Sequence, residues 1–140
     1  MSVYFDASIL VSIFISDAFS DRATRFLAGE ASDLIVSDFA RAEFASALAK
    51  RIRVGASTRE DVQTAFDALD VWASRFTIAV SMVSSDLRAT EIFLRRLDTK
   101  LRTGDALNIA IAQRLGASLA TFDETMAEAA EKMGVTLAAV

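Results

Sequence analysis

The chain has 140 residues, 53% of them hydrophobic and 24% charged, which excludes a disordered chain and predicts a single globular domain over residues 1–140. Its net charge of −4 argues mildly against a nucleic-acid-binding protein, because such proteins are often basic overall. It contains no histidine and no cysteine, which excludes Ser-His-Asp triads, Cys-His pairs, the usual zinc sites and disulfide frameworks.

Five short apolar runs predict buried strands, because each run is too short to form a helix. In chain order these runs are Val3–Phe5, Leu34–Val36, Ile78–Val80, Ser118–Ala120 and Thr136–Ala138. Short apolar runs without alternating polar residues are typical of parallel sheets, in which both faces of each strand are covered. We therefore expect these strands to lie in the interior of the domain.

Segments with helical periodicity separate these runs. A first helix follows Asp6, and the later segments span 21–29, 37–53, 85–97, 103–115 and 124–133. The sequence Ser57-Thr58-Arg59-Glu60 has the spacing of a capping box and predicts the start of another long helix, whose apolar stripe extends from Val62 to Phe76. Strands that alternate with helices predict an α/β fold in which helices flank a parallel sheet of four to five strands.

No segment has the composition of a membrane anchor or a signal peptide. The longest apolar run, Ile9–Ile15, contains Ser12 and falls far short of the ~18 residues that a membrane-spanning helix needs. A signal peptide begins with basic residues, whereas the first basic residue here is Arg22. We therefore expect a cytoplasmic protein that does not enter a membrane.

Four carboxylates stand where the predicted strands and helices meet. Asp6 follows the first strand and Asp123 follows the strand Ser118–Ala120, so both should lie at the edge of the sheet where parallel strands end. Glu43 lies about two turns into the helix over 37–53. Asp105 opens a helix that is apolar nearly all round, so we expect this carboxylate to be buried and to face something polar.

Each acid also has an ordinary structural explanation. Asp6 and Asp123 could cap helices, Asp105 could interact with a helix dipole, and Glu43 could pair with an arginine. Together these explanations weaken, because four carboxylates converging at one end of a sheet repel each other unless a cation joins them. Carboxylate oxygens bind hard cations, so the expected metal is Mg²⁺ or Mn²⁺.

Three stretches carry the resemblance to a known family: YFDASILV, SDFARAEFASAL and GDALNIAIAQRLGASLATFDE. In order and spacing they resemble the PIN-domain ribonucleases, particularly the VapC-type toxins of bacterial toxin–antitoxin pairs. The resemblance implies a PIN-like three-layer sandwich whose metal-site acids are Asp6, Glu43, Asp105 and Asp123. It also implies that the hydroxyl groups of Ser8 and Thr121 support these acids.

Asn108 departs from the family pattern, because many relatives carry histidine at this position. We expect Asn108 to support the acids from beside them, so the departure should not abolish activity. The resemblance implies a Mg²⁺- or Mn²⁺-dependent endoribonuclease, in which Asp6, Asp105 and Asp123 bind metal and Glu43 either binds metal or orients the attacking water. It further implies a homodimer that a cognate antitoxin protein holds inactive.

The densest basic stretch, RRLDTKLR, leads directly into Asp105. Its basic residues, which could guide RNA towards the metal, are Arg95, Arg96, Lys100 and Arg102. An equally good interpretation is a solvated end of a helix, since runs of charge are often only solvated. Salt dependence of RNA binding would separate the two interpretations.

Two other classes of protein fit parts of the sequence. A PIN-like module that binds RNA or protein without catalysis would keep the same fold, and only an assay separates it from a nuclease. A receiver-like phosphoacceptor domain also gathers acids around magnesium, but it would need paired acids after the first strand and a lysine near the last strand. Here one Asp follows the first strand, and the only late lysine, Lys132, falls inside a predicted helix.

Overall fold

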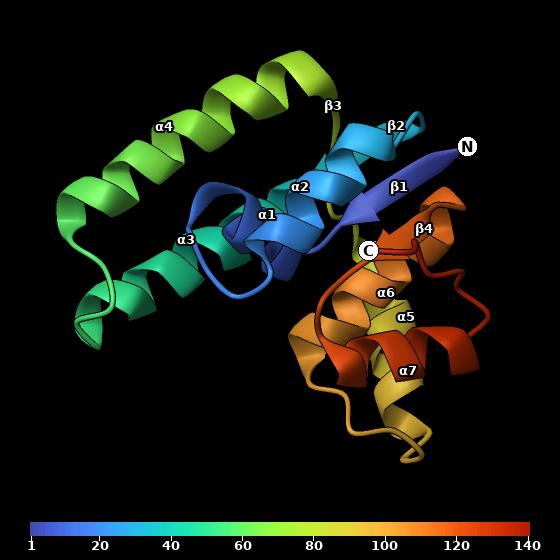
Figure 1. Ribbon diagram of the computed structural model, residues 1–140. Coiled ribbons are helices and arrows are strands. Elements are labelled where there is room, and N and C mark those ends of the chain that lie inside the picture. The colour runs from blue at the N-terminus through green and yellow to red at the C-terminus, as the bar shows by residue number, and fades with distance from the viewer.

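The computed structural model describes residues 1–140 and contains four strands and seven helices (Figure 1). The strands are β1 (Ser2–Phe5), β2 (Asp33–Ser37), β3 (Thr77–Val80) and β4 (Ser118–Ala120). The helices are α1 (Ala7–Phe14), α2 (Ser20–Gly29), α3 (Asp38–Arg53), α4 (Arg59–Phe76), α5 (Ser84–Arg95), α6 (Thr103–Leu115) and α7 (Glu124–Lys132). None of these helices combines the length and the apolar composition that a membrane span requires.

The strands form one parallel sheet in the order β3-β2-β1-β4, which confirms the predicted α/β architecture. Helices α1 to α4 lie on one side of β1 and helices α5 to α7 on the other, so the sheet is the middle layer of three (Figure 1). The predicted fifth strand, Thr136–Ala138, is not a full strand. It makes a single parallel bridge between Leu119 and Leu137, in which both backbone hydrogen bonds go to Leu119.

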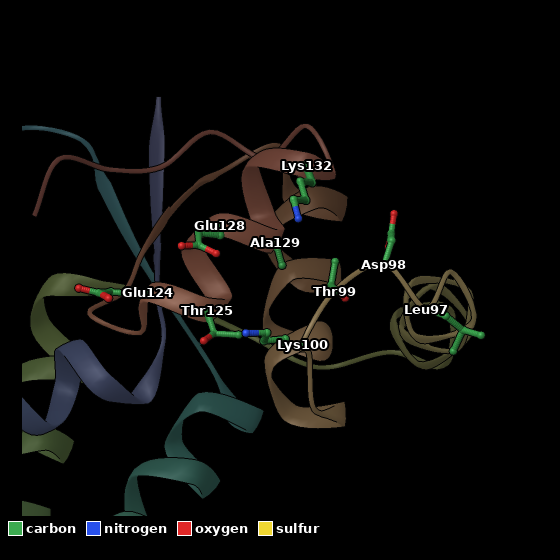
Figure 2. Close-up of a pocket in the computed structure, with 9 residues that line it drawn as sticks. All are labelled: Leu97, Asp98, Thr99, Lys100, Glu124, Thr125, Glu128, Ala129 and Lys132. Carbon is green, nitrogen blue, oxygen red and sulfur yellow. The ribbon is translucent and has the colours of Figure 1, made fainter.

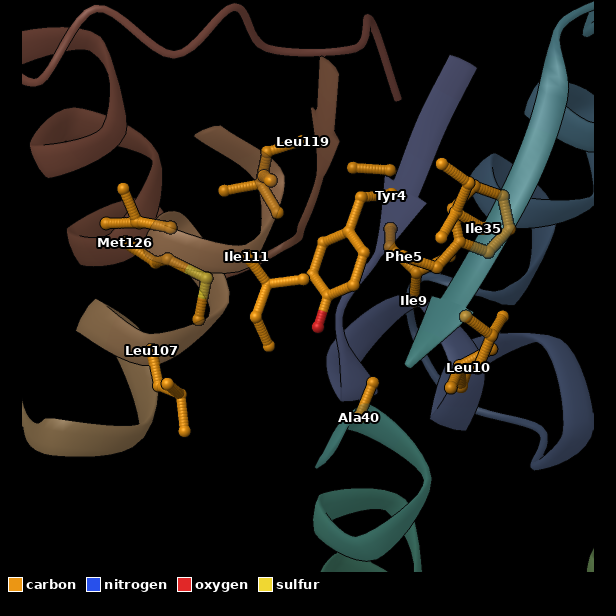
Figure 3. Packing of buried hydrophobic residues seen from close by; sticks show 14 of the residues in the cluster. Tyr4, Phe5, Ile9, Leu10, Ile35, Ala40, Leu107, Ile111, Leu119 and Met126 are labelled. Atoms are coloured by element: carbon orange, nitrogen blue, oxygen red, sulfur yellow. The ribbon is translucent and has the colours of Figure 1, made fainter. Parts of the chain in front are cut away.

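The first strand places one aromatic residue on each face of the sheet. Tyr4 and Phe5 are both fully buried, and successive strand side chains point to opposite faces. Phe5 packs against Phe26 of α2 and Trp72 of α4, with ring centroids 6.0 and 6.2 Å away. Tyr4 lies on the other face beside Ile111 of α6 (Figure 3). The hydrophobic core therefore covers both faces of β1, and this packing fixes the position of Asp6, which directly follows the strand.

Helix α4 begins where the sequence predicted, but Thr58 is its N-cap and accepts a hydrogen bond from Asp61 N at 3.1 Å. Ser57 instead accepts from Arg51 Nε, so the predicted box starts one residue too early. The far end of the predicted apolar stripe also departs from expectation, because Phe76 is 63% exposed. Two other large apolar side chains are exposed in this region, Val71 on α4 and Ile78 on the outermost strand β3.

An ion pair between a buried aspartate on α5 and an exposed arginine on α6 joins the two helices. Asp86 is 1% exposed, and Arg114 grips it with two hydrogen bonds, from Nε at 2.7 Å and from Nη2 at 3.0 Å. The same carboxylate accepts from Val83 N at 2.9 Å, and Arg114 also donates to Ser81 O at 3.1 Å. The arginine therefore neutralises a carboxylate that could not be buried alone.

Candidate active site at the carboxyl ends of the strands

Asp6 stands at the end of β1 and caps α1. Its Oδ1 accepts from Ser8 Oγ at 2.7 Å and from Ile9 N at 3.2 Å, while its Oδ2 accepts from Thr121 Oγ1 at 2.7 Å. The side chain is buried, so these three donors take the place of water around the carboxylate. Asp6 is therefore the N-cap of α1, as the structural explanation expected, and each of its oxygens also accepts a hydrogen bond from a hydroxyl group.

The turn after β4 is tied to the turn after β1. Thr121 Oγ1, which donates to Asp6, accepts from Asp123 N at 3.0 Å, and Ser8 Oγ accepts from Phe122 N at 2.9 Å. Asp123 then caps α7 by accepting from Met126 N at 3.0 Å. Asp6 and Asp123 are thus held at one edge of the sheet, as parallel pairing of β1 and β4 requires.

Asp105 lies in the first turn of α6, and its Oδ2 accepts from Arg102 N at 3.2 Å. The expectation that this carboxylate would be buried is wrong, because Asp105 is only partly buried. The buried apolar surface of α6 begins at the next residue, Ala106, so the helix enters the core just after its acid. Asp105 therefore stands at the border between the core and solvent.

Glu43 is held by a hydrogen-bond network that runs through Asn108, as expected, and through Tyr4 and Ser37, which the sequence analysis did not include. Asn108 Nδ2 donates to Glu43 Oε1 at 2.7 Å, and Asn108 Oδ1 accepts from the Tyr4 hydroxyl at 2.8 Å. The Tyr4 oxygen lies 2.7 Å from Ser37 Oγ. Burial raises the pKa of the Tyr4 phenol, so this group remains a donor. The network orients the Asn108 amide so that its nitrogen faces Glu43.

Glycine at position 104 lets the backbone pass close to the Glu43 carboxylate without displacing it. A Cβ at Gly104 would lie 2.9 Å from Glu43 Oε2, closer than such atoms approach. Gly104 O also accepts from Asn108 Nδ2 at 3.1 Å. The start of α6 therefore packs directly against the Glu43 carboxylate, which brings α3 and α6 together at the site.

Burial raises the pKa values of three of the acids, and for two of them the charge of a neighbouring carboxylate adds to the rise. Burial raises the pKa of Asp6 to about 6, and hydrogen bonds from Thr121 and Ser8 oppose this rise only in part. Burial also raises the pKa of Glu43, and the charges of Asp6 and Asp105 raise it further.

For Asp105, burial again raises the pKa, and the Asp123 charge raises it further. The backbone N–H and the charge of Arg102 both lower the pKa of Asp105, but only in part. The four carboxylates therefore share one negative field, which an added cation would relieve.

The site is not a preformed cage for a metal ion, since no group of three or more acids is arranged to hold one. Asp6 and Asp123 are engaged as helix caps, and Glu43 is engaged with Asn108. The chemistry of the donors nevertheless fits a hard divalent cation, because every charged group of the predicted ligand set is a carboxylate and three of the four have raised pKa values.

A pocket of about 460 Å³ lies between the α5–α6 connection and α7, and none of the four acids lines it (Figure 2). Its lining residues are Leu97, Asp98, Thr99, Lys100, Glu124, Thr125, Glu128, Ala129 and Lys132. Of the four predicted RNA-binding residues, only Lys100 lines this pocket. Arg102 is the N-cap of the helix that carries Asp105. Arg95 and Arg96 instead pair with Glu91 and Asp98 at 2.9 and 2.8 Å.

A family model described as the PIN domain matches residues 3–132. The chain belongs to the PIN domain family. This assignment confirms the resemblance and removes the receiver-like alternative. Ribonuclease VapC46 of Mycobacterium tuberculosis (strain ATCC 25618 / H37Rv) is 30% identical over 141 residues, which cover 99% of this chain and 97% of that protein.

Solved structures agree with this PIN fold. The crystal structure of Mycobacterium tuberculosis VapC20, a sarcin-ricin loop cleaving toxin, has a TM-score of 0.74 at 18% identity and covers 91% of this chain and 94% of its own. VapBC2 from Rickettsia felis, bound to a DNA fragment from its promoter, has a TM-score of 0.71 at 16% identity and covers 99% of this chain and 98% of its own.

Proposed function

We propose that this PIN-domain protein is a divalent-metal-dependent endoribonuclease that acts in the cytoplasm as the toxin of a toxin–antitoxin pair. The observation that carries the proposal is the shared negative field of Asp6, Glu43, Asp105 and Asp123 at the carboxyl ends of the strands. The similarity to VapC46, a ribonuclease, and to VapC20, a toxin that cleaves the sarcin-ricin loop, supports RNA as the substrate.

The residues that would hold Mg²⁺ or Mn²⁺ are Asp6, Asp105 and Asp123, with Glu43 as a fourth ligand or as the group that orients water. When bound, the cation would make a coordinated water more acidic and neutralise charge on the phosphate oxygens. The hydroxyl groups of Ser8 and Thr121 keep both Asp6 oxygens in place through hydrogen bonds of 2.7 Å. Such support limits the rearrangement that ligation requires.

Glu43 is the residue best placed to handle a proton. The Asn108 amide donates to its Oε1 and lowers its pKa, while burial and the neighbouring acids raise it. The net result is a pKa of Glu43 above that of an ordinary glutamate and therefore closer to neutral pH, as general acid–base catalysis requires. Arg102 is the N-cap of the helix that carries Asp105, and Lys100 lines the pocket next to α7. Both side chains would bind phosphates that flank the cleaved bond.

The partners in this proposal are a second copy of the chain and an antitoxin. Val71, Phe76 and Ile78 are 51%, 63% and 49% exposed on α4 and the edge strand β3, which supports an apolar contact between two copies. Phe76→Glu should then convert a dimer into a monomer in light scattering. The acidic site would attract an arginine of an antitoxin, and the VapBC2 neighbour supports such a partner.

The test compares RNA cleavage by the wild type and by Asp105→Asn in Mn²⁺, in Mg²⁺ and in EDTA. Cleavage should require the cation and should disappear in Asp105→Asn without loss of folding. Asp67→Asn, which changes an exposed acid on α4 in the same way, should cleave like the wild type. An active Asp105→Asn protein would contradict the assignment, and an inactive wild type would favour the PIN-like binding module without catalysis.

A further inference from the structure

Two phenylalanine rings and an arginine form an exposed stack at the edge of the acidic site. Phe19 stacks on Phe122 with ring centroids 4.8 Å apart and planes inclined by 23°. The guanidinium carbon of Arg22 lies 5.0 Å from the Phe122 centroid and 5.7 Å from the Phe19 centroid. Despite both contacts, Phe19 keeps 41% of its surface exposed. Ring surface therefore remains free to bind a flat ligand.

The stack is joined to the proposed catalytic residues through the backbone. Phe122 lies between Thr121, which donates to Asp6, and Asp123, which caps α7. The Phe122 N–H itself donates to Ser8 Oγ at 2.9 Å. A ligand that stacks on Phe19 would therefore lie beside the acids, within the reach of one nucleotide chain.

The loop that carries Phe19 is held rigid by Asp17. The carboxylate accepts from Ser12 Oγ at 2.9 Å and from Phe19 N at 2.8 Å, and Asp17 N donates to Ser20 Oγ at 2.9 Å. Ser20 Oγ also donates to Ile15 O at 3.0 Å. The exposed position of Phe19 is thus fixed by the fold before any ligand arrives, which lowers the entropy cost of binding.

We propose that Phe19, backed by Phe122 and Arg22, is a stacking site for a base of the RNA substrate next to the cleaved phosphate. The inference rests on the proposed ribonuclease function and adds the residues that would position the substrate. Single-stranded RNA is commonly held by bases stacked on aromatic rings, with cations along the backbone. A nearby guanidinium also strengthens contact with a nucleotide, because it attracts both the ring faces and the phosphate.

The test measures binding of a short, uncleavable 2′-O-methyl oligonucleotide in Mn²⁺. Phe19→Leu removes the ring but keeps an apolar side chain, and it should weaken binding by roughly 5- to 150-fold. Phe19→Trp keeps an aromatic face and should restore binding. The added indole should also be quenched by the oligonucleotide, after subtraction of the Trp72 signal measured in the wild type. Thermal melting of each variant controls for folding.

Cleavage kinetics of RNA separate positioning from chemistry. Phe19→Leu should raise KM by the same factor as it weakens oligonucleotide binding, with kcat unchanged, because the ring contributes to binding alone. If Phe19→Leu leaves both KM and the dissociation constant of the oligonucleotide at their wild-type values, the stacking site is refuted while the ribonuclease proposal stands. A wild type that binds the oligonucleotide through Phe19 but cleaves no RNA would leave the stacking site intact and refute the proposed chemistry.

Two further outcomes would also overturn the stacking site. In the first, the wild type binds no oligonucleotide. In the second, Phe19→Leu loses affinity for an arginine-rich peptide while its affinity for RNA is unchanged, which would make the stack a protein contact. An oligonucleotide that lacks its bases but keeps its phosphates should bind the wild type and Phe19→Leu equally, since only a base can stack.

Discussion

Asp6→Asn should stabilise the metal-free protein at neutral pH, although Asp6 caps α1. The carboxylate is buried, and its pKa is raised to about 6 from an ordinary value of 3.8. The folded state therefore holds the proton more tightly than the unfolded state does. The contribution of protonated Asp6 to the free energy of unfolding is fully present below the unfolded-state pKa and is lost as pH rises through the folded-state pKa. The free energy of unfolding therefore declines between about pH 4 and pH 6.

The size of the effect follows from the difference between the folded-state and unfolded-state pKa values. A difference of one in pKa corresponds to about 1.4 kcal/mol, so ionised Asp6 lowers the free energy of unfolding at pH 7 by roughly 3 kcal/mol. The pKa values of Glu43 and Asp105 are raised in the same direction, so they steepen the decline in the wild type. Comparing wild type with Asp6→Asn at each pH isolates the share of Asp6.

The assay is urea unfolding in EDTA at pH 4.5, 5.5 and 7, followed by the same series in Mn²⁺. Asp6→Asn should exceed the wild type at pH 7 and approach it at pH 4.5. Mn²⁺ at 100 times its dissociation constant should stabilise the wild type by about 2.7 kcal/mol and the variant by much less. Asp86→Asn is the matched control, since this buried aspartate is paired with Arg114 and its replacement should destabilise.

A variant Asp6→Asn that is less stable than the wild type at pH 7 in EDTA would refute this reasoning. It would mean that the hydrogen bonds from Ser8 and Thr121 favour the charged carboxylate by more than burial disfavours it. A stability that rises with pH between 4.5 and 7 would have the same implication, because the sign of the linkage would be reversed.

Three other substitutions test individual contacts. Gly104→Ala should push the Glu43 carboxylate aside and reduce kcat for RNA by about 100-fold with little change in Tm, and unaltered kcat would show that Glu43 needs no fixed position. Arg114→Met should cost about 1–3 kcal/mol in urea unfolding, because it removes the charged partner of buried Asp86, and an unchanged free energy of unfolding would mean that water reaches that carboxylate. Asn108→Leu should destabilise the protein by about 1–3 kcal/mol, because it removes partners of buried polar groups, and an unchanged Tm would contradict that network.

Much of the fold was predictable because burial leaves a periodic pattern in the sequence. Four of the five predicted strands lie within one residue of the observed β1 to β4, and α4 begins as expected. Thr136–Ala138 forms only one bridge to β4, because its backbone hydrogen bonds go to Leu119 alone and a local apolar pattern does not show how far a segment pairs. Phe76 failed as a core residue because α4 runs to the open edge of the sheet at β3 (Figure 1).

The placement of Asp6 and Asp123 at one edge of the sheet was predictable because both residues follow strand ends. Asp6 and Asp123 come directly after β1 and just after β4, so a parallel sheet places them at one edge. Tyr4 and Asn108 are 104 positions apart, and their hydrogen bond depends on the packing of α6 against one face of β1. The same is true of Phe19 and Phe122, whose stacking becomes visible only once α2 and the turn after β4 lie together.

The contrast between the two buried aspartates explains why the acidic site points to a function. Asp86 is satisfied within the chain, because Arg114 cancels its charge. Asp6 receives only neutral donors, and the charges nearest to the cluster are other carboxylates, with Arg102 as an opposing charge at Asp105. A fold under selection for stability alone would lose this repulsion through single substitutions to asparagine. The caps and hydroxyl donors instead keep the acids in position at a cost in stability, and a positive charge from outside the chain would remove that cost.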